Sequence, residues 1–584
     1  MAGLYAASGP VAVAAVDAPK ADVRGVADRA LRAEIQQAIG RASPASSRIE
    51  ARRRAREAAE IAISVLRSEG YYDYQVDSDL GDGDAPQPFV TVTPGPRTKI
   101  SRTAIVWIGD APDAQTQAAA TAAMALRSGD PGRAAEVVAA EGRIVATIQR
   151  RGYADAASTP REVIVDHADL SMQPTYRVRA GALVRFDGVR LASHGRTSPS
   201  WVQRLAPWKA HDVYRPEAVA ELERRLTDTG AFGAVTVSLA PAREAVGDER
   251  PVVVSLADRS KGALELGASY STSEGAGVNS RWLLYNQLGR GDTLTNSLQY
   301  AEIDSRLQTE LSLPDWRVPQ ETLKLTAALY RERPIAYQVY GVGISADLTH
   351  RYGKTSFLSI GASLDGTNTN EEEQANFVTK GRMRRLATGA VYAAFALDRS
   401  DDPLNPTRGW RLDARVQPTV SVGDGSLTYV KTWTQATGYL PLNVFDTVLA
   451  ARIKVGTILG GNIPLVPAQD RFYAGGGGSV RGYGYQEVGP RFSDNNPQGG
   501  LSLFEGSFEV RKRLSEQWGV VAFLDAGGVG PQVNPDLTRP KYGAGLGVRY
   551  NLGFGPLRFD IATPINPGKG DALIQIYLSI GQSF

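Results

Sequence analysis

A change of hydrophobic period near residue 261 constrains the fold of this chain more than any other feature. Before it, apolar residues recur at helical spacing, whereas beyond Lys261 short segments alternate apolar and polar residues between Gly, Asn, Asp and Pro. The last segment is the clearest, and one face of its strand would carry Ile574, Ile576, Leu578, Ile580 and Phe584. The pattern predicts an all-β domain over residues 262–584.

The charges within this region favour a membrane barrel over a soluble sandwich. Between Phe504 and Leu514 one strand face would carry two glutamates and two arginines. Such a face cannot be buried in a dry core, but it can line a wet lumen while the other face meets lipid. The region is large for a sandwich and long enough for sixteen strands of about ten residues. No run of about 18 or more apolar residues encodes a transmembrane helix.

The chain before residue 259 repeats with a period of about 80 residues. Three helical patterns stop at Gly70, Gly152 and Gly230, and an aromatic residue follows within two positions of each glycine, which is typical of a helix C-cap. The order strand, helix, helix, strand, strand then predicts three small α+β domains in series, with one large mixed domain as the alternative. The predicted boundaries are 22–97, 98–178 and 179–258. Residues 1–21 are expected to be a disordered segment or the remnant of a signal.

The composition excludes several classes of function. The 65 Lys+Arg and 62 Asp+Glu residues give a formal net charge of +3, which is too balanced to indicate a nucleic-acid partner. There are no cysteines, and the four histidines do not show the spacing of zinc ligands on a helix. We therefore expect no metal site and no cofactor.

The richest motif lies at residues 471–483, where four consecutive glycines precede Ser-Val-Arg-Gly-Tyr. It is not a phosphate-binding loop, because neither Gly-Lys-Ser/Thr nor a helix follows. The glycines at 543, 545 and 547 mimic a dinucleotide motif but lie in a strand-like run. A flexible surface loop is the alternative for residues 475–478, yet Arg481 followed by Gly482 forms a compact tip that is suited to being held.

These motifs resemble the superfamily of outer-membrane assembly and secretion barrels that includes BamA, TamA and the two-partner secretion transporters. In that family a stretch like residues 472–483 lies on a long extracellular loop that folds back into the lumen. The block at residues 398–410 and the late segments at 507–509, 523–527 and 543–564 are also similar to it. The repeated N-terminal units resemble its periplasmic POTRA domains. The resemblance implies α+β POTRA repeats followed by an all-β 16-stranded antiparallel transmembrane barrel.

The number of POTRA-like units indicates the TamA branch, because BamA typically carries five and two-partner secretion transporters carry two. This branch implies a non-enzymatic factor in the bacterial outer membrane, with its N-terminal domains in the periplasm. Its partners would be a TamB-like protein spanning the periplasm, unfolded clients of the β-barrel and autotransporter type, and outer-membrane lipid. The alternatives are an exporter of one dedicated substrate, a role in lipid transport and a passive channel.

The resemblance also implies two sites. The first is a loop lock formed by Val480, Arg481, Gly482 and Tyr483, in which the arginine pairs with a lumenal aspartate. Strand alternation places Asp525 on one face with Phe523, and Glu509 on one face with Arg511. The second is the barrel seam, where the last strand must pair with the first and would bend at a glycine. Its residues are Gly581, Phe584, Leu264 and Leu266.

Overall fold

A computed structural model describes residues 18–82, 86–193, 195–271, 275–353, 355–375, 378–442, 446–552 and 556–580. The chain divides into two compact units. One comprises Met1–Arg190, Ala206–Glu221 and Val237–Val253, and the other comprises Leu191–Leu205, Leu222–Thr236 and Val254–Phe584. None of the helices in the described ranges is both long and apolar enough to cross a membrane.

The first α/β repeat shows why the N-terminal pattern folds locally. Helix α2 (Arg48–Ser68) begins at Ser47, whose hydroxyl accepts from the amide of Glu50, and it buries one face of alanines that ends in Leu66. This face packs on a sheet of order β2-β5-β4. The remaining elements are β1 (Ala18–Pro19), β2 (Asp22–Arg24), α1 (Arg29–Ile39), β3 (Arg41–Ala42), β4 (Gln75–Leu80) and β5 (Pro88–Thr93).

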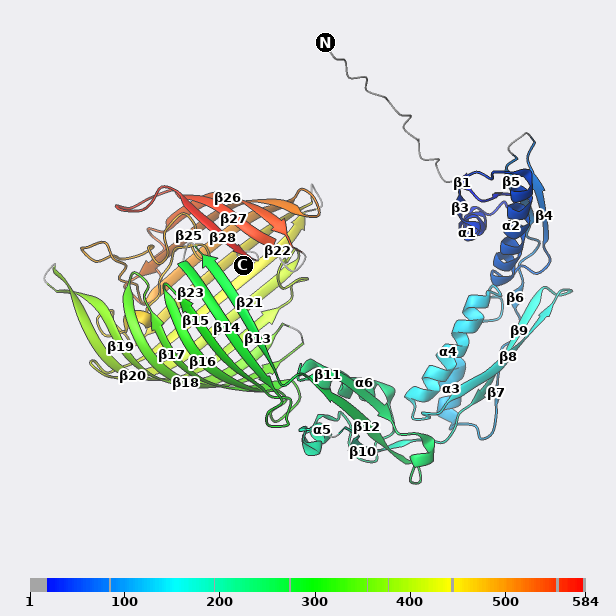
Figure 1. The fold of residues 1–584 in the computed structure, drawn as a ribbon, viewed down its shortest axis with the longest axis horizontal. Helices are drawn as coiled ribbons and strands as arrows, with labels where there is room; N and C mark the ends of the chain where they lie inside the picture. Colours follow the sequence, from blue (N-terminus) through cyan, green and yellow to red (C-terminus); the bar gives the residue numbers. More distant parts are fainter. Residues whose placement is uncertain are drawn as a thin grey trace, which may run out of the picture. The chain divides into compact units, whose positions relative to one another are not determined.

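The second and third repeats also contain a strand, two helices and two further strands, and the second has one extra short strand, β6 (Figure 1). The second contains β6 (Lys99–Ile100), β7 (Ala104–Trp107), α3 (Ala114–Met124), α4 (Ala134–Arg150), β8 (Ala157–Asp166) and β9 (Ser171–Arg179). The third contains β10 (Arg185–Leu191), α5 (Pro199–Leu205), α6 (Pro216–Asp228), β11 (Phe232–Leu239), the short helix η1 (Ala242–Glu244) and β12 (Glu249–Asp258). In all three sheets the last strand lies between the other two, with β6 added in the second.

The glycines that punctuate the sequence lie where the repeats need them. Gly70, Gly152 and Gly230 have φ angles of 88°, 103° and 68°, a region that favours glycine, and each follows the end of a helix. The predicted order strand, helix, helix, strand, strand is therefore present in each repeat, although in the first the short strand β3 lies between the two helices. We propose that the domain boundaries follow it, at 22–97, 98–178 and 179–258, because each of these ranges holds the main sheet of one repeat, except that β9 ends one residue beyond 178.

The second half of the chain forms one sheet of sixteen strands, each antiparallel to its neighbour in sequence, as predicted. The first eight are β13 (Gly262–Ser271), β14 (Gly275–Tyr285), β15 (Thr293–Ala301), β16 (Asp304–Leu313), β17 (Glu321–Glu332), β18 (Tyr337–Arg351), β19 (Phe357–Ala375) and β20 (Val378–Asp398). The last eight are β21 (Gly409–Gly423), β22 (Leu427–Leu442), β23 (Thr447–Leu459), β24 (Ser502–Arg513), β25 (Trp518–Gly530), β26 (Lys541–Asn551), β27 (Pro556–Pro564) and β28 (Gln575–Ile580).

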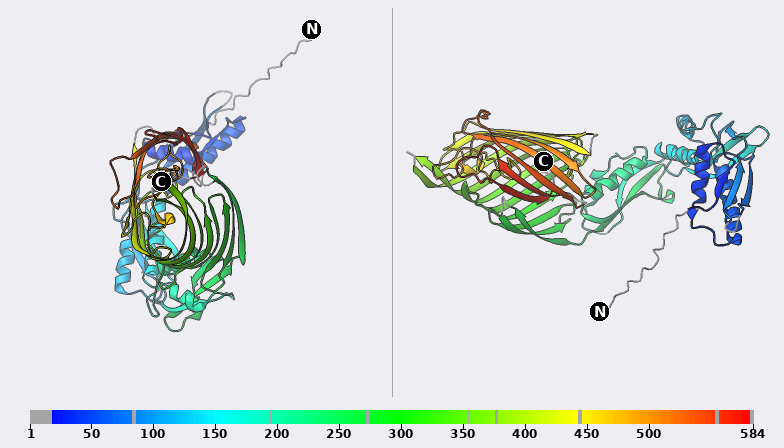
Figure 2. Two further views of the ribbon diagram at one scale, coloured as in Figure 1. Left: turned by 90° about the vertical axis from the view of Figure 1, so that its left-hand side faces the viewer. Right: turned by 90° about the horizontal axis from the view of Figure 1, so that it is seen from above.

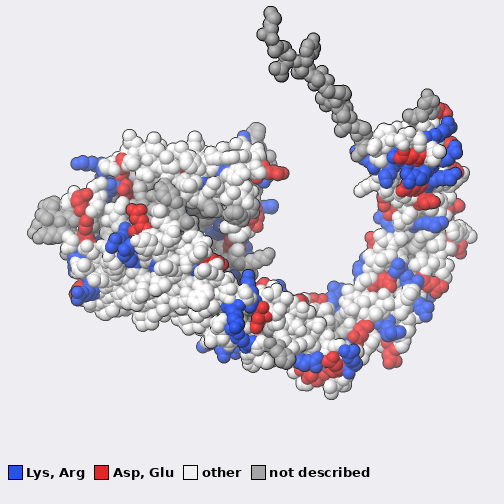
Figure 3. All heavy atoms as spheres, viewed as in Figure 1, with Lys and Arg blue, Asp and Glu red and all other residues white. Residues whose placement is uncertain are grey.

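The sheet carries its apolar residues on the outside. In β28, Ile576 and Leu578 are exposed while Tyr577 between them is buried, and Leu264 and Leu266 of β13 are also exposed. Figure 3 shows the consequence, since the visible surface of the strand region is largely uncharged, whereas the α/β domains carry many Lys, Arg, Asp and Glu. This is the arrangement expected of a barrel whose outer face meets lipid.

The predicted closure of the barrel is not observed. The described parts of β13 and β28 lie next to each other but share no ladder, so the sixteen-stranded sheet is open at this seam. The described part of β28 has 6 residues, all paired with β27, and that of β13 has 10. Gly581 and Phe584, which we assigned to the seam, lie outside the described residues.

The chain between β23 and β24 folds back inside the ring of strands, where Figure 2 shows it in the view along the barrel. This long loop, residues 460–501, contains the short helix η2 (Ala468–Asp470). It brings its own apolar core against the inner face of the sheet. That core includes Val466, Phe472, Val480, Tyr483 and Val488 of the loop, with Tyr429, Ile458 and Leu503 of the strands.

Candidate functional site: the buried anchors of the long loop

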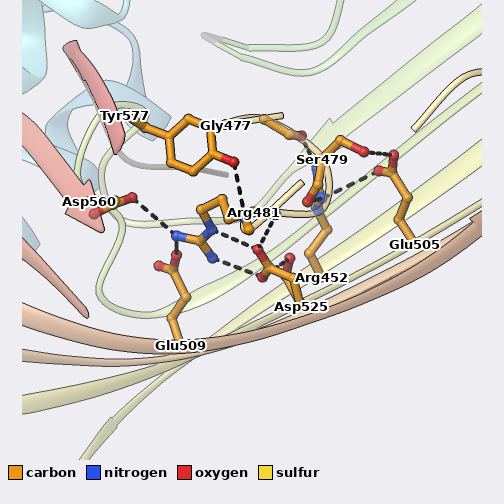
Figure 4. Close-up of polar contacts among 12 residues, drawn as sticks. Arg452, Gly477, Ser479, Arg481, Glu505, Glu509, Asp525, Asp560 and Tyr577 are labelled. Carbon is orange, nitrogen blue, oxygen red and sulfur yellow. Dashed lines mark hydrogen bonds and ion pairs between the residues drawn. The ribbon is translucent and has the colours of Figure 1, made fainter. Parts of the chain in front are cut away.

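The tip of the long loop places Arg481 among three carboxylates from three strands (Figure 4). Its guanidinium holds Asp525 of β25 with both ends of the fork, at 2.7 Å from Nε to Oδ2 and 2.9 Å from Nη2 to Oδ1. Nη1 lies 2.7 Å from Glu509 of β24 and 3.3 Å from Asp560 of β27. Arg481 is 1% exposed, so these charges interact where water screens them little.

Further contacts fix the orientation of this ion cluster. The ring of Phe523 lies under the guanidinium, 3.5 Å from its central carbon to the ring centroid. The backbone amide of Arg481 donates to Asp525 Oδ2 at 3.0 Å, and Ser507 Oγ donates to Oδ1 at 2.8 Å. Asp525, Phe523 and Glu509 are the residues expected at this site from the sequence, and the structure brings all three to Arg481. The sequence did not indicate Asp560 or Ser507 as members of the site.

The residues around Arg481 are also held. Gly482 has a φ of 100°, and its amide donates to Tyr577 Oη of β28 at 3.0 Å. The same Tyr577 hydroxyl donates to the carbonyl of Tyr483 at 2.9 Å, while Tyr483 Oη donates to Asn566 Oδ1 at 2.9 Å. Val480 is fully buried in the loop core. The tip is thus tied to β28, the last strand of the open sheet, as well as to β24, β25 and β27.

Three alternating glycines of β26 make room for this arrangement. A Cβ on Gly543 would lie 1.7 Å from the carbonyl oxygen of Arg481. A Cβ on Gly545 would lie 2.4 Å from the Phe523 ring, and one on Gly547 would lie 1.9 Å from Asp560 Oδ1. The alternation was visible in the sequence, but only as a false dinucleotide motif. In the structure it marks the strand on which the loop tip rests.

The charged face of β24 requires a correction. We expected it to line a wet lumen, but Glu505, Glu509 and Arg511 are each at most 6% exposed. Ser479 and Arg481 of the long loop contact Glu505 and Glu509, whereas Arg511 lies against Tyr439 of β22. Their charges are compensated by partners, as burial demands. Arg511 Nε lies 2.8 Å from Glu509, and Arg549 and Arg558 both pair with Asp560. Arg513 is different, since its exposed side chain pairs with Asp446 at the end of the strand.

A second contact holds the glycine run that precedes the tip. Arg452 of β23 donates to the carbonyls of Gly478 and Ser479, at 2.9 and 3.2 Å. It also lies 3.3 Å from Glu505, whose other carboxylate oxygen accepts from Ser479 Oγ at 2.5 Å. The glycine run is therefore clamped to the wall of the barrel, which excludes the alternative of a free surface loop.

Sequence analysis missed a third anchor, at the start of the loop. Arg384 of β20 pairs with Glu371 of β19 at 2.9 Å and donates to the carbonyl of Leu465 at 2.9 Å. The other oxygen of Glu371 accepts from the amide of Ala468 at 2.8 Å and lies 3.5 Å from Arg471. Only the strand register could have indicated this anchor. Arg384 of β20 is paired with Thr369 of β19, and Glu371 lies two residues beyond Thr369 on the same face of β19.

The chemistry of the site is that of a noncovalent lock. Within the described ranges, no group of three or more His, Cys, Asp or Glu side chains could hold a metal ion. What the cluster provides is directional, charge-assisted bonding of one loop to β24, β25 and β27, to which Tyr577 of β28 adds neutral hydrogen bonds. Such bonds hold a segment in place and release it when the geometry of the strands changes.

Serial α/β repeats, followed by a sixteen-stranded antiparallel sheet that is apolar outside and holds a charged loop inside, define the class of outer-membrane barrels with periplasmic modules. Residues 286–584 match the Omp85 superfamily domain, and the chain belongs to that superfamily. The barrel accordingly resides in the bacterial outer membrane, with the N-terminal domains in the periplasm.

Two relatives similar in sequence carry the same name. The chain is 24% identical over 432 residues to the outer membrane protein assembly factor BamA of Neorickettsia risticii, covering 70% of this chain and 56% of that protein. It is 24% identical over 408 residues to BamA of Nitratidesulfovibrio vulgaris, covering 68% and 50%. The chain thus spans about half the length of the curated relatives that it matches.

A solved structure supports the fold. BamA from Haemophilus ducreyi, in a form lacking POTRA domains 1–3, superposes with a TM-score of 0.71 at 20% identity, covering 82% of this chain and 99% of that one. At this identity the likeness establishes the architecture of α/β modules and barrel, and no more than that.

Proposed function

We propose that this chain assembles or translocates other proteins at the outer membrane, without enzymatic chemistry. The observation that carries the proposal is the open seam, where the described parts of β13 and β28 share no ladder. A strand edge inside a membrane leaves backbone groups unsatisfied, at a cost of several kcal/mol each. An incoming client strand can satisfy them by pairing with the edge of β13, which is association by β-augmentation.

The loop lock supports the same proposal, because it connects the seam to the rest of the barrel. Tyr577 of β28 binds the loop tip through Gly482 and Tyr483, and the tip binds Asp525 through Arg481. Holding β28 to the loop sets how far the last strand can move away from its neighbours. The names of the matched relatives, outer membrane protein assembly factors, agree with this role.

Our finer proposal is a TamA-like assembly factor. The three α/β repeats support it, since each sheet has outer strands whose edges can accept an extended chain. The partner that fits is a TamB-like protein of the periplasm, and the clients are barrel and autotransporter-type proteins. Export of one dedicated substrate would differ in its product, since the substrate would cross the membrane without being inserted.

The proposal is tested by locking the seam. The chain has no cysteines, so one introduced pair, within residues 264–267 of β13 and 576–580 of β28, gives a single disulfide. In liposomes with an unfolded barrel client, this cross-link should abolish client folding, and reduction should restore it. The matched control joins Ala327 to Ile344, which are paired in β17 and β18 and face outward. Full activity with the seam disulfide formed would contradict lateral opening.

A further inference from the structure

A groove on the outer wall of the barrel crosses strands β15 to β21 and has a volume of about 920 Å³. The strand register explains its shape. Paired positions on the lipid-facing side form one apolar row, made of Leu307, Leu329, Val342, Gly366, Ala387 and Val422. Large side chains stand at both ends of the row, whereas Gly366 and Ala387 in the middle leave its floor low.

The next row on the same face is polar. Two residues further along each strand, the register pairs Tyr300, Ser305, Arg331, Tyr340, Asn368 and Arg385. All of them line the groove. The apolar floor therefore meets a rim that carries two guanidinium groups and two phenol rings.

The polar row lies in the outer half of the barrel strands, at the strand ends in β15 and β17 and seven residues inside the outer end in β19 and β20. The first strand, β13, begins directly after the periplasmic domains, so odd-numbered strands such as β17 run away from the periplasm. Arg331 is the next-to-last residue of β17, and Tyr300 is the next-to-last residue of β15. The groove thus points its apolar floor into the membrane and its two arginines toward the headgroups of the outer leaflet.

The arginines are available for an external anion. Within the described part of the chain, neither Arg331 nor Arg385 has an ion pair. The carboxylate of Asp424 contacts the backbone of Arg385, accepting from its amide at 2.9 Å. Most buried arginines of the barrel have carboxylate partners, as Arg384 beside Arg385 does. An arginine on a lipid-facing wall finds its natural partner in a phosphate, which its planar fork binds with two hydrogen bonds.

We propose that this groove binds a phosphorylated lipid of the outer leaflet, of the lipid A class. One acyl chain lies along the floor at Gly366 and Ala387, and the phosphates meet Arg331 and Arg385. An ordinary belt of aromatic and basic residues at the membrane interface would need no depression below it. Here the depression and the two arginines without carboxylate partners lie on adjacent rows of the same strands.

The test uses the folded full-length chain in detergent and lipid A with both phosphates, with the bound fraction measured by native mass spectrometry. R331A/R385A should weaken retention by about tenfold or more, since each arginine supplies charge-assisted hydrogen bonds. The control R351A/R513A removes the same charge at the periplasmic ends of β18 and β24, away from the groove. Its retention of lipid A should stay within about twofold of that of the unmodified chain. Folding of each variant is checked by its mobility in an unheated gel.

Two further arms separate the floor from the rim. G366L fills the groove without changing its charge and should also weaken retention. The extra side chain can be accommodated, because a Cβ there would meet Val342 at an ordinary 3.6 Å. Lipid A stripped of its phosphates should be retained weakly, and inorganic phosphate should not displace intact lipid A. Equal retention by R331A/R385A, equal retention of the stripped lipid, or displacement by inorganic phosphate would overturn the proposal.

Discussion

Arg481 satisfies three carboxylates from three strands at once, which a shorter or more flexible cation could not do. Lysine offers a point charge, whereas the guanidinium fork matches Asp525 with two parallel bonds and turns its remaining nitrogen to Glu509 and Asp560. The neighbouring Gly482 lets the chain turn at a φ of 100° so that the fork can enter. The planar shape of the guanidinium therefore matters at this site as well as its charge.

Arg481→Ala should release the loop tip while leaving the barrel folded. Leaving buried carboxylates without their partner costs about 1–3 kcal/mol locally, and strand ladders do not depend on the pair. Limited proteolysis of the loop and client folding in liposomes would both report the change. In a double mutant with Asp525→Ala the losses should be strongly non-additive, because both changes break one contact. Additive losses would refute the pairing as the functional unit.

Gly543→Ala should have a similar effect through sterics alone. The new Cβ would lie 1.7 Å from the Arg481 carbonyl, so the tip must move away from β26. The control is Gly506→Ala in β24, where the nearest atom is 3.7 Å away. We expect the protease to cleave the loop of Gly543→Ala faster than that of the unmodified chain, and we expect no such increase in Gly506→Ala. If cleavage of the loop does not increase in Gly543→Ala, the backbone of β26 has shifted and the loop tip has stayed in place.

At the scale of elements, a salt bridge joins the second and third proposed domains. Arg250 of β12 donates with both ends of its fork to Asp155, which follows α4, and Arg250 is 5% exposed. The hydrogen bonds from Arg250 hold the pKa of Asp155 below its ordinary value. The bridge therefore couples two elements of different repeats through one titratable group.

The sign of the pH dependence follows from that shift. Because the folded pKa of Asp155 is depressed, its stabilising contribution is present above the unfolded value of about 3.9 and is lost as pH falls through the folded value. Urea unfolding of residues 1–258 should show this loss in acid. Asp155→Asn should lower the free energy of unfolding at neutral pH. Below about pH 4 the free energies of unfolding of the variant and of the unmodified fragment should differ less. A constant difference across this range would exclude the bridge as the source.

At the scale of the whole molecule, the two halves of the chain need different solvents. Each α/β repeat buries its own core, such as the one around Ile35, Leu66 and Val90 in the first. The strand region instead turns large apolar residues outward. One part is therefore stable in water, and the other is stable in lipid.

Expressed separately, residues 1–258 should be soluble and monomeric, whereas residues 262–584 should require detergent. The second fragment should also migrate differently in unheated and heated gels, as folded barrels do. The result is read by sedimentation and by gel mobility. A water-soluble, folded fragment 262–584 would be incompatible with a membrane barrel.

The sequence by itself determined the elements of this protein, because their causes are local. Helix periodicity, C-cap glycines and strand alternation each act over a few residues, so the repeats and an all-β second half could be predicted, while the number of sixteen strands came from the family resemblance. A family resemblance supplied Arg481 and a lumenal aspartate. Strand alternation then placed Phe523 on the face of Asp525.

Only the tertiary structure determined which residues of distant strands and of the long loop come into contact. Asp560, Tyr577 and the glycines of β26 meet the loop tip because the strands curve around it, and Glu371 meets Arg384 and Arg471 only when a long loop returns to them. The open seam has the same origin. Alternation specifies which way a side chain points, but contacts between residues distant in sequence depend on register and on closure, which no local pattern encodes.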